Sequence, residues 1–71
     1  MLTIEFYDTQ EKPIKKANFN TLNEVLRELE FGSPEDARIA RIFDVNRAPG
    51  DRALLFMKNG IYWQTVIEDW A

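Results

Sequence analysis

The residues with the clearest chemical potential are basic side chains in the second half of the chain, with aromatic residues close to them. Between Arg38 and Lys58 the basic residues outnumber the acidic ones, and Phe56, Tyr62 and Trp63 lie nearby in the sequence. Cations around exposed aromatic rings can bind single-stranded nucleic acid, because bases stack on the rings while phosphates meet the cations. The basic residues of this candidate platform are Arg38, Arg41, Arg47, Arg52 and Lys58.

The charge of the whole chain argues against such a platform. The net charge is −3, whereas affinity for nucleic acid depends on neutralising phosphates. Phe56 and Trp63 are expected to face the core, and no RNP-type motif accompanies them. Core aromatic residues beside solvated arginines explain the pattern better, so a nucleic-acid partner is disfavoured. Single-stranded nucleic-acid binding remains the second alternative function.

Catalytic chemistry has few candidate residues. The chain contains no His and no Cys, so general bases near neutral pH, thiol nucleophiles and most zinc sites lack their usual side chains. The single Ser, Ser33, precedes Pro34 and is expected to cap a helical turn. A chain of 71 residues with one helix also has little concave volume in which burial could raise a carboxyl pKa. We predict a protein that is not an enzyme, with no catalytic residues, cofactor, metal or small-molecule substrate.

The segment that begins at Asp44 matches a calcium-binding loop at only two positions. Asp44 and Asn46 supply oxygen ligands at the first and third positions. The fifth position is Ala48, the required sixth-position glycine is Pro49, and Leu55 stands where a glutamate is needed. An ordinary polar loop is the better interpretation.

Acidic residues gather in the middle of the chain. Between Asn20 and Asp36 they outnumber the single basic residue, Arg27. Those on the expected helix fall away from its apolar stripe, as on an ordinary solvated helix face. The sharper hypothesis is that this face docks on a basic surface of a partner, such as one that normally holds nucleic acid. The partner-binding acids in this hypothesis are Glu24, Glu28 and Glu30.

Three aromatic residues, Phe56, Tyr62 and Trp63, lie on an expected hairpin near the end of the sequence. Two β-prone runs, Ala53–Met57 and Ile61–Ile67, flank Lys58 and the pair Asn59-Gly60. Asn-Gly between such runs predicts a two-residue type I′ turn, because both central residues need positive φ. The resulting register pairs Lys58 with Ile61, Met57 with Tyr62, Phe56 with Trp63, Leu55 with Gln64, Leu54 with Thr65 and Ala53 with Val66.

This hairpin is apolar on both faces, whereas a sheet with one wet face alternates between apolar and polar residues. The face assigned to the core carries Leu54, Phe56, Ile61, Trp63 and Ile67. One helix can cover only one face of a sheet, so the outer face is predicted to bind a partner protein or a second copy of the chain. The outer residues assigned to partner binding are Leu55, Met57, Tyr62, Gln64 and Val66. The alternative is that Ile39–Val45, Trp70 or the loop of the second strand covers them.

The first half of the chain predicts two strands and a helix. Leu2, Ile4 and Phe6 alternate with polar residues in a first strand, and Ile14–Phe19 forms a returning edge strand protected by its lysines. A helix is expected from about Thr21 to Phe31, where Thr21 and Glu24 fit a capping box. Its apolar stripe is Leu22, Val25, Leu26 and Leu29.

Gly32 is expected to end this helix in the left-handed conformation. Beyond it we predict one helical turn at Pro34–Ala37 and a strand at Ile39–Val45, with a second full helix as the alternative. Asn46–Asp51 reads as a loop with a Pro49-Gly50 turn, and Trp70 is expected to fold back onto the sheet.

Together these elements predict an α+β fold in a single compact domain, residues 1–71. The expected order is β-β-α-β-β-β, in a small antiparallel or mixed sheet of four to five strands with one main helix packed on one face. No apolar run approaches the length of a membrane helix, and the first residues lack the layout of a signal peptide. We therefore expect a cytoplasmic protein with no membrane partner.

The leading functional hypothesis is a non-catalytic protein-binding module. It would be a small acidic regulator or inhibitor that acts by direct contact with a larger protein or complex. Its size and lack of catalytic chemistry extend the hypothesis to a phage- or plasmid-encoded protein. The alternative is a homodimeric structural or accessory protein paired through the outer face of the hairpin.

Overall fold

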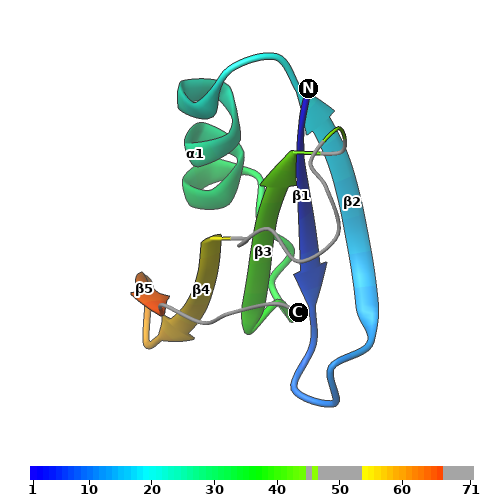
Figure 1. Ribbon diagram of the computed structural model, residues 1–71. Coiled ribbons are helices and arrows are strands. Elements are labelled where there is room, and N and C mark those ends of the chain that lie inside the picture. The colour runs from blue at the N-terminus through cyan, green and yellow to red at the C-terminus, as the bar shows by residue number, and fades with distance from the viewer. Residues whose placement is uncertain (45, 47–53, 67–71) are drawn as a thin grey trace.

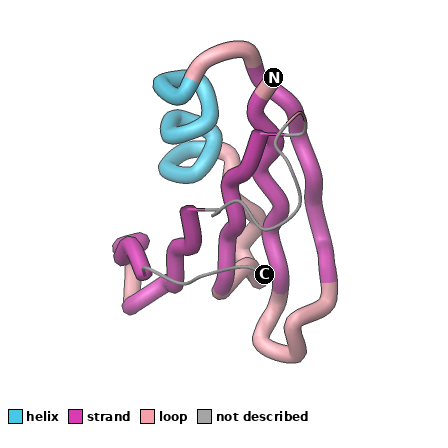
Figure 2. The backbone as a smooth tube through the Cα atoms, viewed as in Figure 1, coloured by secondary structure: helices cyan, strands magenta, loops and turns pink. Residues whose placement is uncertain are grey.

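The computed structural model describes residues 1–44, 46 and 54–66 (Figure 1). The elements in chain order are β1 (Leu2–Tyr7), β2 (Pro13–Phe19), α1 (Leu22–Phe31), β3 (Ile39–Asp44), β4 (Leu54–Asn59) and β5 (Tyr62–Val66). The strands form one five-stranded sheet in the order β2-β1-β3-β4-β5, and every neighbouring pair is antiparallel. Helix α1 packs on one side of the sheet (Figure 2). The predicted α+β class and element order are confirmed, and the sheet is antiparallel rather than mixed.

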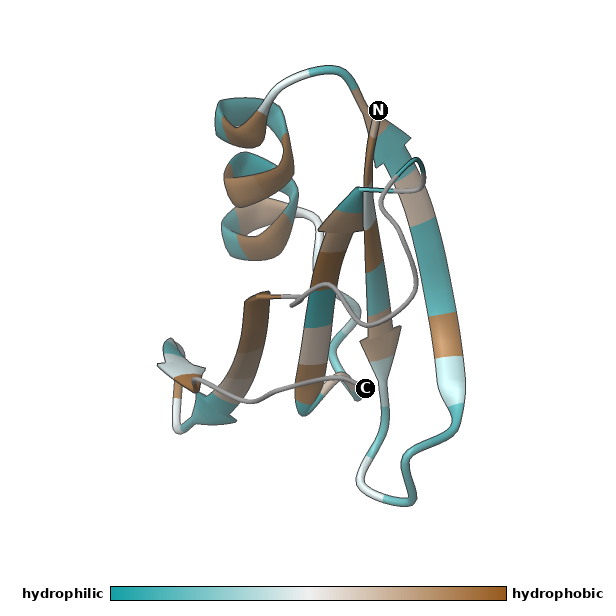
Figure 3. Cartoon of the chain, in the orientation of Figure 1, coloured by the Kyte–Doolittle hydropathy of each residue, from teal (hydrophilic) through white to brown (hydrophobic). Residues whose placement is uncertain are grey.

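The core lies between α1 and the central strands β1 and β3. Ile4 of β1 pairs with Ile42 of β3, and Phe6 pairs with Ala40. All four side chains are buried, together with Val25 and Leu29 of α1. The alternation of apolar and polar residues along β1, visible in Figure 3, places Thr3, Glu5 and Tyr7 on the opposite face.

The helix begins where the capping box predicts. The Glu24 amide donates to the Thr21 side-chain oxygen at 3.3 Å, and the Thr21 amide donates to the Glu24 carboxylate at 3.1 Å. These reciprocal bonds satisfy two amides that the first turn leaves without helical partners. The stripe that includes Val25 and Leu29 then packs on β1 and β2.

The left-handed stop predicted at Gly32 is wrong. Gly32 has φ −111°, and its amide donates to the Glu28 carbonyl at 2.8 Å. A Cβ atom here would overlap the Glu28 carboxylate, which is the end of a flexible side chain and could move aside. Lys15 of β2 holds that region in place, since its Nζ donates to the Gly32 carbonyl at 2.8 Å and lies 3.6 Å from the Glu28 carboxylate.

The segment between α1 and β3 is a turn followed by a strand. The Ala37 amide donates to the Pro34 carbonyl at 3.1 Å, which closes the single predicted turn. β3 follows at Ile39–Asp44, as predicted, and excludes the alternative of a second helix over these residues. The expected end of this strand at Val45, the Pro49-Gly50 turn and the position of Trp70 lie outside the described residues.

The predicted register of the β4–β5 hairpin is wrong by two residues. The turn consists of Gly60 and Ile61, and only Gly60 has positive φ, at 66°, which is the pattern of a type II′ rather than a type I′ turn. A shift of two keeps every side chain on its predicted face, so the apolar pattern does not distinguish the two registers. The observed pairs are Asn59 with Tyr62, Lys58 with Trp63, Met57 with Gln64, Phe56 with Thr65 and Leu55 with Val66.

The turn between β1 and β2 also contains a residue with positive φ. The Asp8 carboxylate accepts hydrogen bonds from the amides of Gln10 and Lys12 at 2.9 and 3.0 Å. Between them Glu11 has φ 62°, a left-handed conformation that favours glycine or asparagine. The two hairpins therefore turn at similar φ values with different residue types.

Candidate protein-binding surface

A groove of about 370 Å³ separates α1 from the β4–β5 hairpin. In Figure 1 both elements lie on the same side of β3, with the helix above and the hairpin below. Apolar side chains from both elements form most of the lining, with one acid and one lysine among them. The lining residues are Leu26, Leu29, Glu30, Phe56, Lys58, Ile61, Tyr62 and Trp63.

The groove exists because of where the helix lies. α1 packs on β1 and β2, and this buries Val25 and Leu29 but leaves Leu26 on the flank of the stripe that faces the hairpin. On the opposite wall Ile61 is 80% exposed and Tyr62 is 72% exposed. Large apolar side chains at this exposure, gathered in one depression, are typical of an interaction site rather than of a solvated surface.

Packed aromatic rings support the part of the groove that Trp63 lines. The Trp63 ring lies 6.1 Å from the Phe6 ring, centroid to centroid, and the two planes are inclined at 55°. Trp63 of β5 therefore packs against Phe6, a core residue of β1, although β3 and β4 lie between these two strands in the sheet. The Lys58 ammonium lies 5.3 Å from the centroid of Trp63, its cross-strand partner. These contacts fix the hairpin relative to the core.

The structure divides the three acids predicted to bind a partner. Glu24 is exposed and closes the capping box, and Glu28 pairs with Lys15 of β2. Glu30 lines the groove on the other side of α1. The acids therefore do not share one position on the helix, and Glu30 alone joins the apolar residues of the hairpin within the part of the chain that the structure describes.

The outer face of the hairpin is unevenly covered. Leu55 is 6% exposed, and Val66 is half-buried. Met57, Tyr62 and Gln64 are exposed, with Met57 at 47%. The predicted outer set thus contains one core residue at Leu55 and an exposed patch towards the tip of the hairpin.

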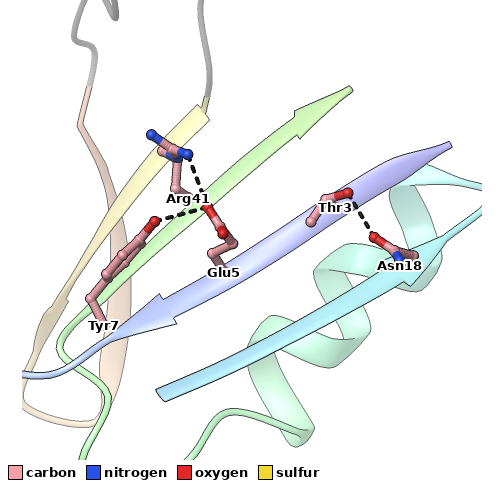
Figure 4. Close-up of polar contacts among 5 residues, drawn as sticks. All are labelled: Thr3, Glu5, Tyr7, Asn18 and Arg41. Atoms are coloured by element: carbon pink, nitrogen blue, oxygen red, sulfur yellow. Dashed lines mark hydrogen bonds and ion pairs between the residues drawn. The ribbon is translucent and has the colours of Figure 1, made fainter. Parts of the chain in front are cut away.

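Nearer the centre of the sheet, the same face carries polar contacts (Figure 4). The Arg41 guanidinium donates to the Glu5 carboxylate at 2.9 Å, and the Tyr7 hydroxyl donates to the same oxygen at 2.8 Å. Burial, followed by the hydrogen bond to Glu5, raises the pKa of Tyr7 above its usual value near 10.0. Beside them the buried Thr3 hydroxyl donates to the Asn18 side chain at 2.7 Å.

Three of the five basic residues of the candidate nucleic-acid platform are described, and each has a partner within the fold. Arg38 donates to the carbonyls of Glu35 and Ala37 at 3.0 and 2.9 Å. Arg41 pairs with Glu5 and lies 4.8 Å from the ring centroid of Phe43. Lys58 lies over Trp63, as described above. The remaining members, Arg47 and Arg52, lie outside the described residues.

Comparisons with known proteins give no match. The chain matches no protein-family model, no curated protein and no solved structure. Any functional conclusion therefore depends on the geometry of this chain.

Two further features concern metals and membranes. Among residues 1–44, 46 and 54–66, no cluster of three or more His, Cys, Asp or Glu side chains could hold a metal ion. In the candidate calcium loop, Asp44 accepts the Asn46 amide at 2.9 Å and lies 3.9 Å from the N-terminal ammonium. Within the same described ranges, no helix combines the length and the apolar character needed to cross a membrane.

Sequence reasoning missed several groove residues. The helical stripe predicts Leu26 in the core, and the alternation of the hairpin predicts Ile61 on its core face. Their positions depend on where α1 lies across the sheet, which helical periodicity does not specify. One signal was present, because Leu26 and Glu30 are four residues apart and must lie on the same side of a helix.

Proposed function

We propose that this protein is a non-catalytic binding module, a small acidic regulator or inhibitor that acts by direct contact with a larger protein. The observation that supports this most strongly is the groove between α1 and the β4–β5 hairpin, with Ile61 and Tyr62 exposed on one wall and Leu26 on the other. Aromatic and aliphatic side chains in a partly formed pocket are the residues that anchor protein interfaces.

Charge gives the groove a preference among partners. Glu30 lies beside Leu26 on the helix wall, the Lys58 ammonium on the other wall lies over the Trp63 ring, and the chain as a whole carries a net charge of −3. A partner that presents an apolar side chain flanked by a basic residue would pack on Leu26 and pair with Glu30. Complementary charge accelerates association and disfavours acidic competitors. The partner we propose is therefore a protein that presents an apolar anchor within a basic surface.

The groove can be tested with two variants matched for exposure. Ile61→Ser removes an anchor from the hairpin wall, whereas Phe31→Ser removes a side chain that is equally exposed, at 78%, but does not line the groove. Each variant is used as bait in lysate of the cells that produce the protein, and circular dichroism first verifies that it folds. We expect Ile61→Ser to lose a partner that Phe31→Ser retains. Equal capture by both variants would contradict the proposal.

The preference for a basic partner surface can be tested with a second matched pair of variants. Glu30→Lys and Glu35→Lys change the net charge equally, but only Glu30 lines the groove. We expect Glu30→Lys to weaken partner binding about tenfold and to reduce its salt dependence, and Glu35→Lys to have a much smaller effect. Equal weakening by the two variants would indicate a general effect of charge and would remove Glu30 from the site.

A further inference from the structure

The two edges of the sheet differ in how well they resist pairing with another strand. β2 forms one edge, begins at Pro13, carries Lys15 and Lys16, and has an irregular register near its start. Proline, lysine and bulges are the features that keep an edge from recruiting a further strand. β5 forms the other edge, and its sequence, Tyr-Trp-Gln-Thr-Val, has neither proline nor charge.

The β4–β5 ladder determines which backbone groups of β5 point outward. Asn59 and Tyr62 flank the two-residue turn and therefore form a hydrogen-bonded pair. Such pairs alternate along an antiparallel ladder, so the backbone groups of Gln64 also point towards β4. Those of Trp63 and Thr65 point away from β4, in the direction where a sixth strand would add.

We propose that β5 pairs with β5 of a second copy of this chain about a two-fold axis at Gln64, and so joins two sheets into one. In this register Trp63 and Thr65 exchange backbone hydrogen bonds with Thr65 and Trp63 of the second copy. Tyr62 lies opposite Val66 of the second copy, and the two Gln64 residues lie opposite each other. These last are non-hydrogen-bonded pairs, in which facing side chains approach most closely.

The composition of β5 favours its own copy as the added strand. A two-fold axis places residues of one strand opposite residues of the same strand, so a charged edge would bring like charges together. β5 has no charge to oppose, whereas two β2 edges would bring Lys15 and Lys16 of both copies together. The pairing of Tyr62 with Val66 joins an aromatic and a β-branched residue, a favourable combination, and covers a tyrosine that is otherwise 72% exposed.

The size of the contact sets its strength. Five paired residues span about 17 Å, which is shorter than the extent of a standard protein interface. The dimer is therefore reversible, and its population rises with protein concentration.

This inference does not rest on the proposed function. Tyr62 and Trp63 belong both to the groove lining and to the β5 register, whereas Leu26, Glu30 and Ile61 line the groove and take no part in that register. A dimer that captures no other protein would contradict the proposed function alone. A monomer that still loses its partner on Ile61→Ser would contradict the dimer alone.

Sedimentation velocity of the purified chain over a wide concentration range gives the first test. The sedimentation coefficient is expected to rise from the monomer value to the dimer value. Gln64→Lys places two ammonium groups opposite each other at the axis, and should raise the dissociation constant about tenfold or more. A chain that stays monomeric up to millimolar concentration, or a dimer that Gln64→Lys leaves unchanged, would overturn the proposal.

A second variant tests the backbone contribution. Thr65→Pro removes an amide that points away from β4, so the ladder within the hairpin keeps its hydrogen bonds while the edge loses a donor. Circular dichroism verifies the fold. A folded Thr65→Pro variant is expected to be monomeric, and a folded variant that dimerises like the parent chain would place the contact elsewhere.

Cross-linking tests the register directly, because the chain contains no cysteine. In a non-hydrogen-bonded pair the Cα atoms lie about 4.5 Å apart, within the range of about 4.4–6.8 Å that a disulfide spans. Gln64→Cys should therefore give a disulfide-linked dimer under mild oxidation, while Lys16→Cys on the β2 edge stays monomeric over the same period. Equal cross-linking of the two variants, or none at Gln64→Cys, would overturn the register. Strand addition to a different protein without self-association would overturn the choice of partner.

Discussion

The part of the sheet beneath α1 and the β4–β5 hairpin are both rich in apolar residues, yet they use these residues differently. In β1 and β3 the apolar side chains Ile4, Phe6 and Ile42 are almost completely buried. In the hairpin, Leu54, Met57, Ile61 and Tyr62 are between 45% and 80% exposed. The difference follows from the helix, because ten residues span about 15 Å and can cover only part of a sheet five strands wide. Stability is therefore expected to be concentrated under the helix, whereas these side chains of the hairpin stay exposed.

The largest expected contrast comes from truncating one apolar residue in each region. Phe6→Ala removes a fully buried ring, and should lower the free energy of unfolding by about 3–5 kcal/mol. Ile61→Ala at the hairpin tip should change it by less than about 0.5 kcal/mol. Urea unfolding followed by circular dichroism measures both. Similar losses for the two variants would show that the hairpin tip belongs to the core.

Removal of the helix cap tests whether α1 causes the contrast. Thr21→Ala deletes the side-chain oxygen that accepts the Glu24 amide, and should cost about 1 kcal/mol. Hydrogen exchange should increase more in β1 and β2, which α1 contacts, than in β4 and β5. Thr9→Ala in the exposed β1–β2 turn serves as the control. A uniform increase over all five strands would argue that the sheet unfolds as one unit.

The two tyrosines give a comparison that depends on pH. Tyr7→Phe removes the hydrogen bond to Glu5 and should cost about 1 kcal/mol near neutral pH, whereas Tyr62→Phe should cost less. The pKa of Tyr7 is raised in the folded state, so the native protein keeps this proton at a pH where the unfolded chain has lost it. The stabilisation is complete below the unfolded pKa of about 10, and is lost as pH rises through the folded pKa. As pH rises above about 10, the free energy of unfolding should fall more steeply for Tyr62→Phe, which keeps Tyr7, than for Tyr7→Phe. Equal slopes would contradict the assignment of this pH dependence to Tyr7.

The smallest expected effects come from the two turns. Glu11 and Gly60 have φ values of 62° and 66°, and only glycine adopts this region without cost. Glu11→Gly should raise the free energy of unfolding by about 0.5 kcal/mol, while Gly60→Ala should lower it by about 1 kcal/mol. No atom would contact the added Cβ at Gly60, so the loss would report the backbone alone. Thermal unfolding measures both changes, and effects of the same sign would contradict the explanation.

Local sequence signals predicted the parts of the fold that depend on local chemistry. The alternation through Leu2, Ile4 and Phe6 gave β1, and the pairing of Thr21 with Glu24 gave the start of α1. The hairpin register failed because Asn59-Gly60 fits a type I′ turn, while the chain uses Gly60 as the first residue of a different turn. The apolar pattern could not correct this, since a shift of two residues leaves both faces unchanged.

The site was less predictable than the fold because it depends on how elements are placed across the sheet. The sequence predicts Tyr62 on the outer face of the hairpin, and in the structure this side chain is 72% exposed and also contributes to the lining of the groove. Glu24, Glu28 and Glu30 form one predicted set because all three fall away from the apolar stripe of the helix, although capping and the Lys15 ion pair hold the first two. Leu26 and Ile61 come to line the same groove only once α1 lies over β1 and β2.

The central position of β1 has a consequence for how the chain reaches its native state. β1 has β2 on one side and β3 on the other, and β2 and α1 separate β1 from β3 along the chain. The β1–β2 hairpin, the β4–β5 hairpin and α1 require only local contacts. Pairing of β1 with β3 joins residues far apart in the chain, and therefore carries most of the entropy cost of loop closure. The transition state for folding is therefore expected to contain this one long-range strand pairing.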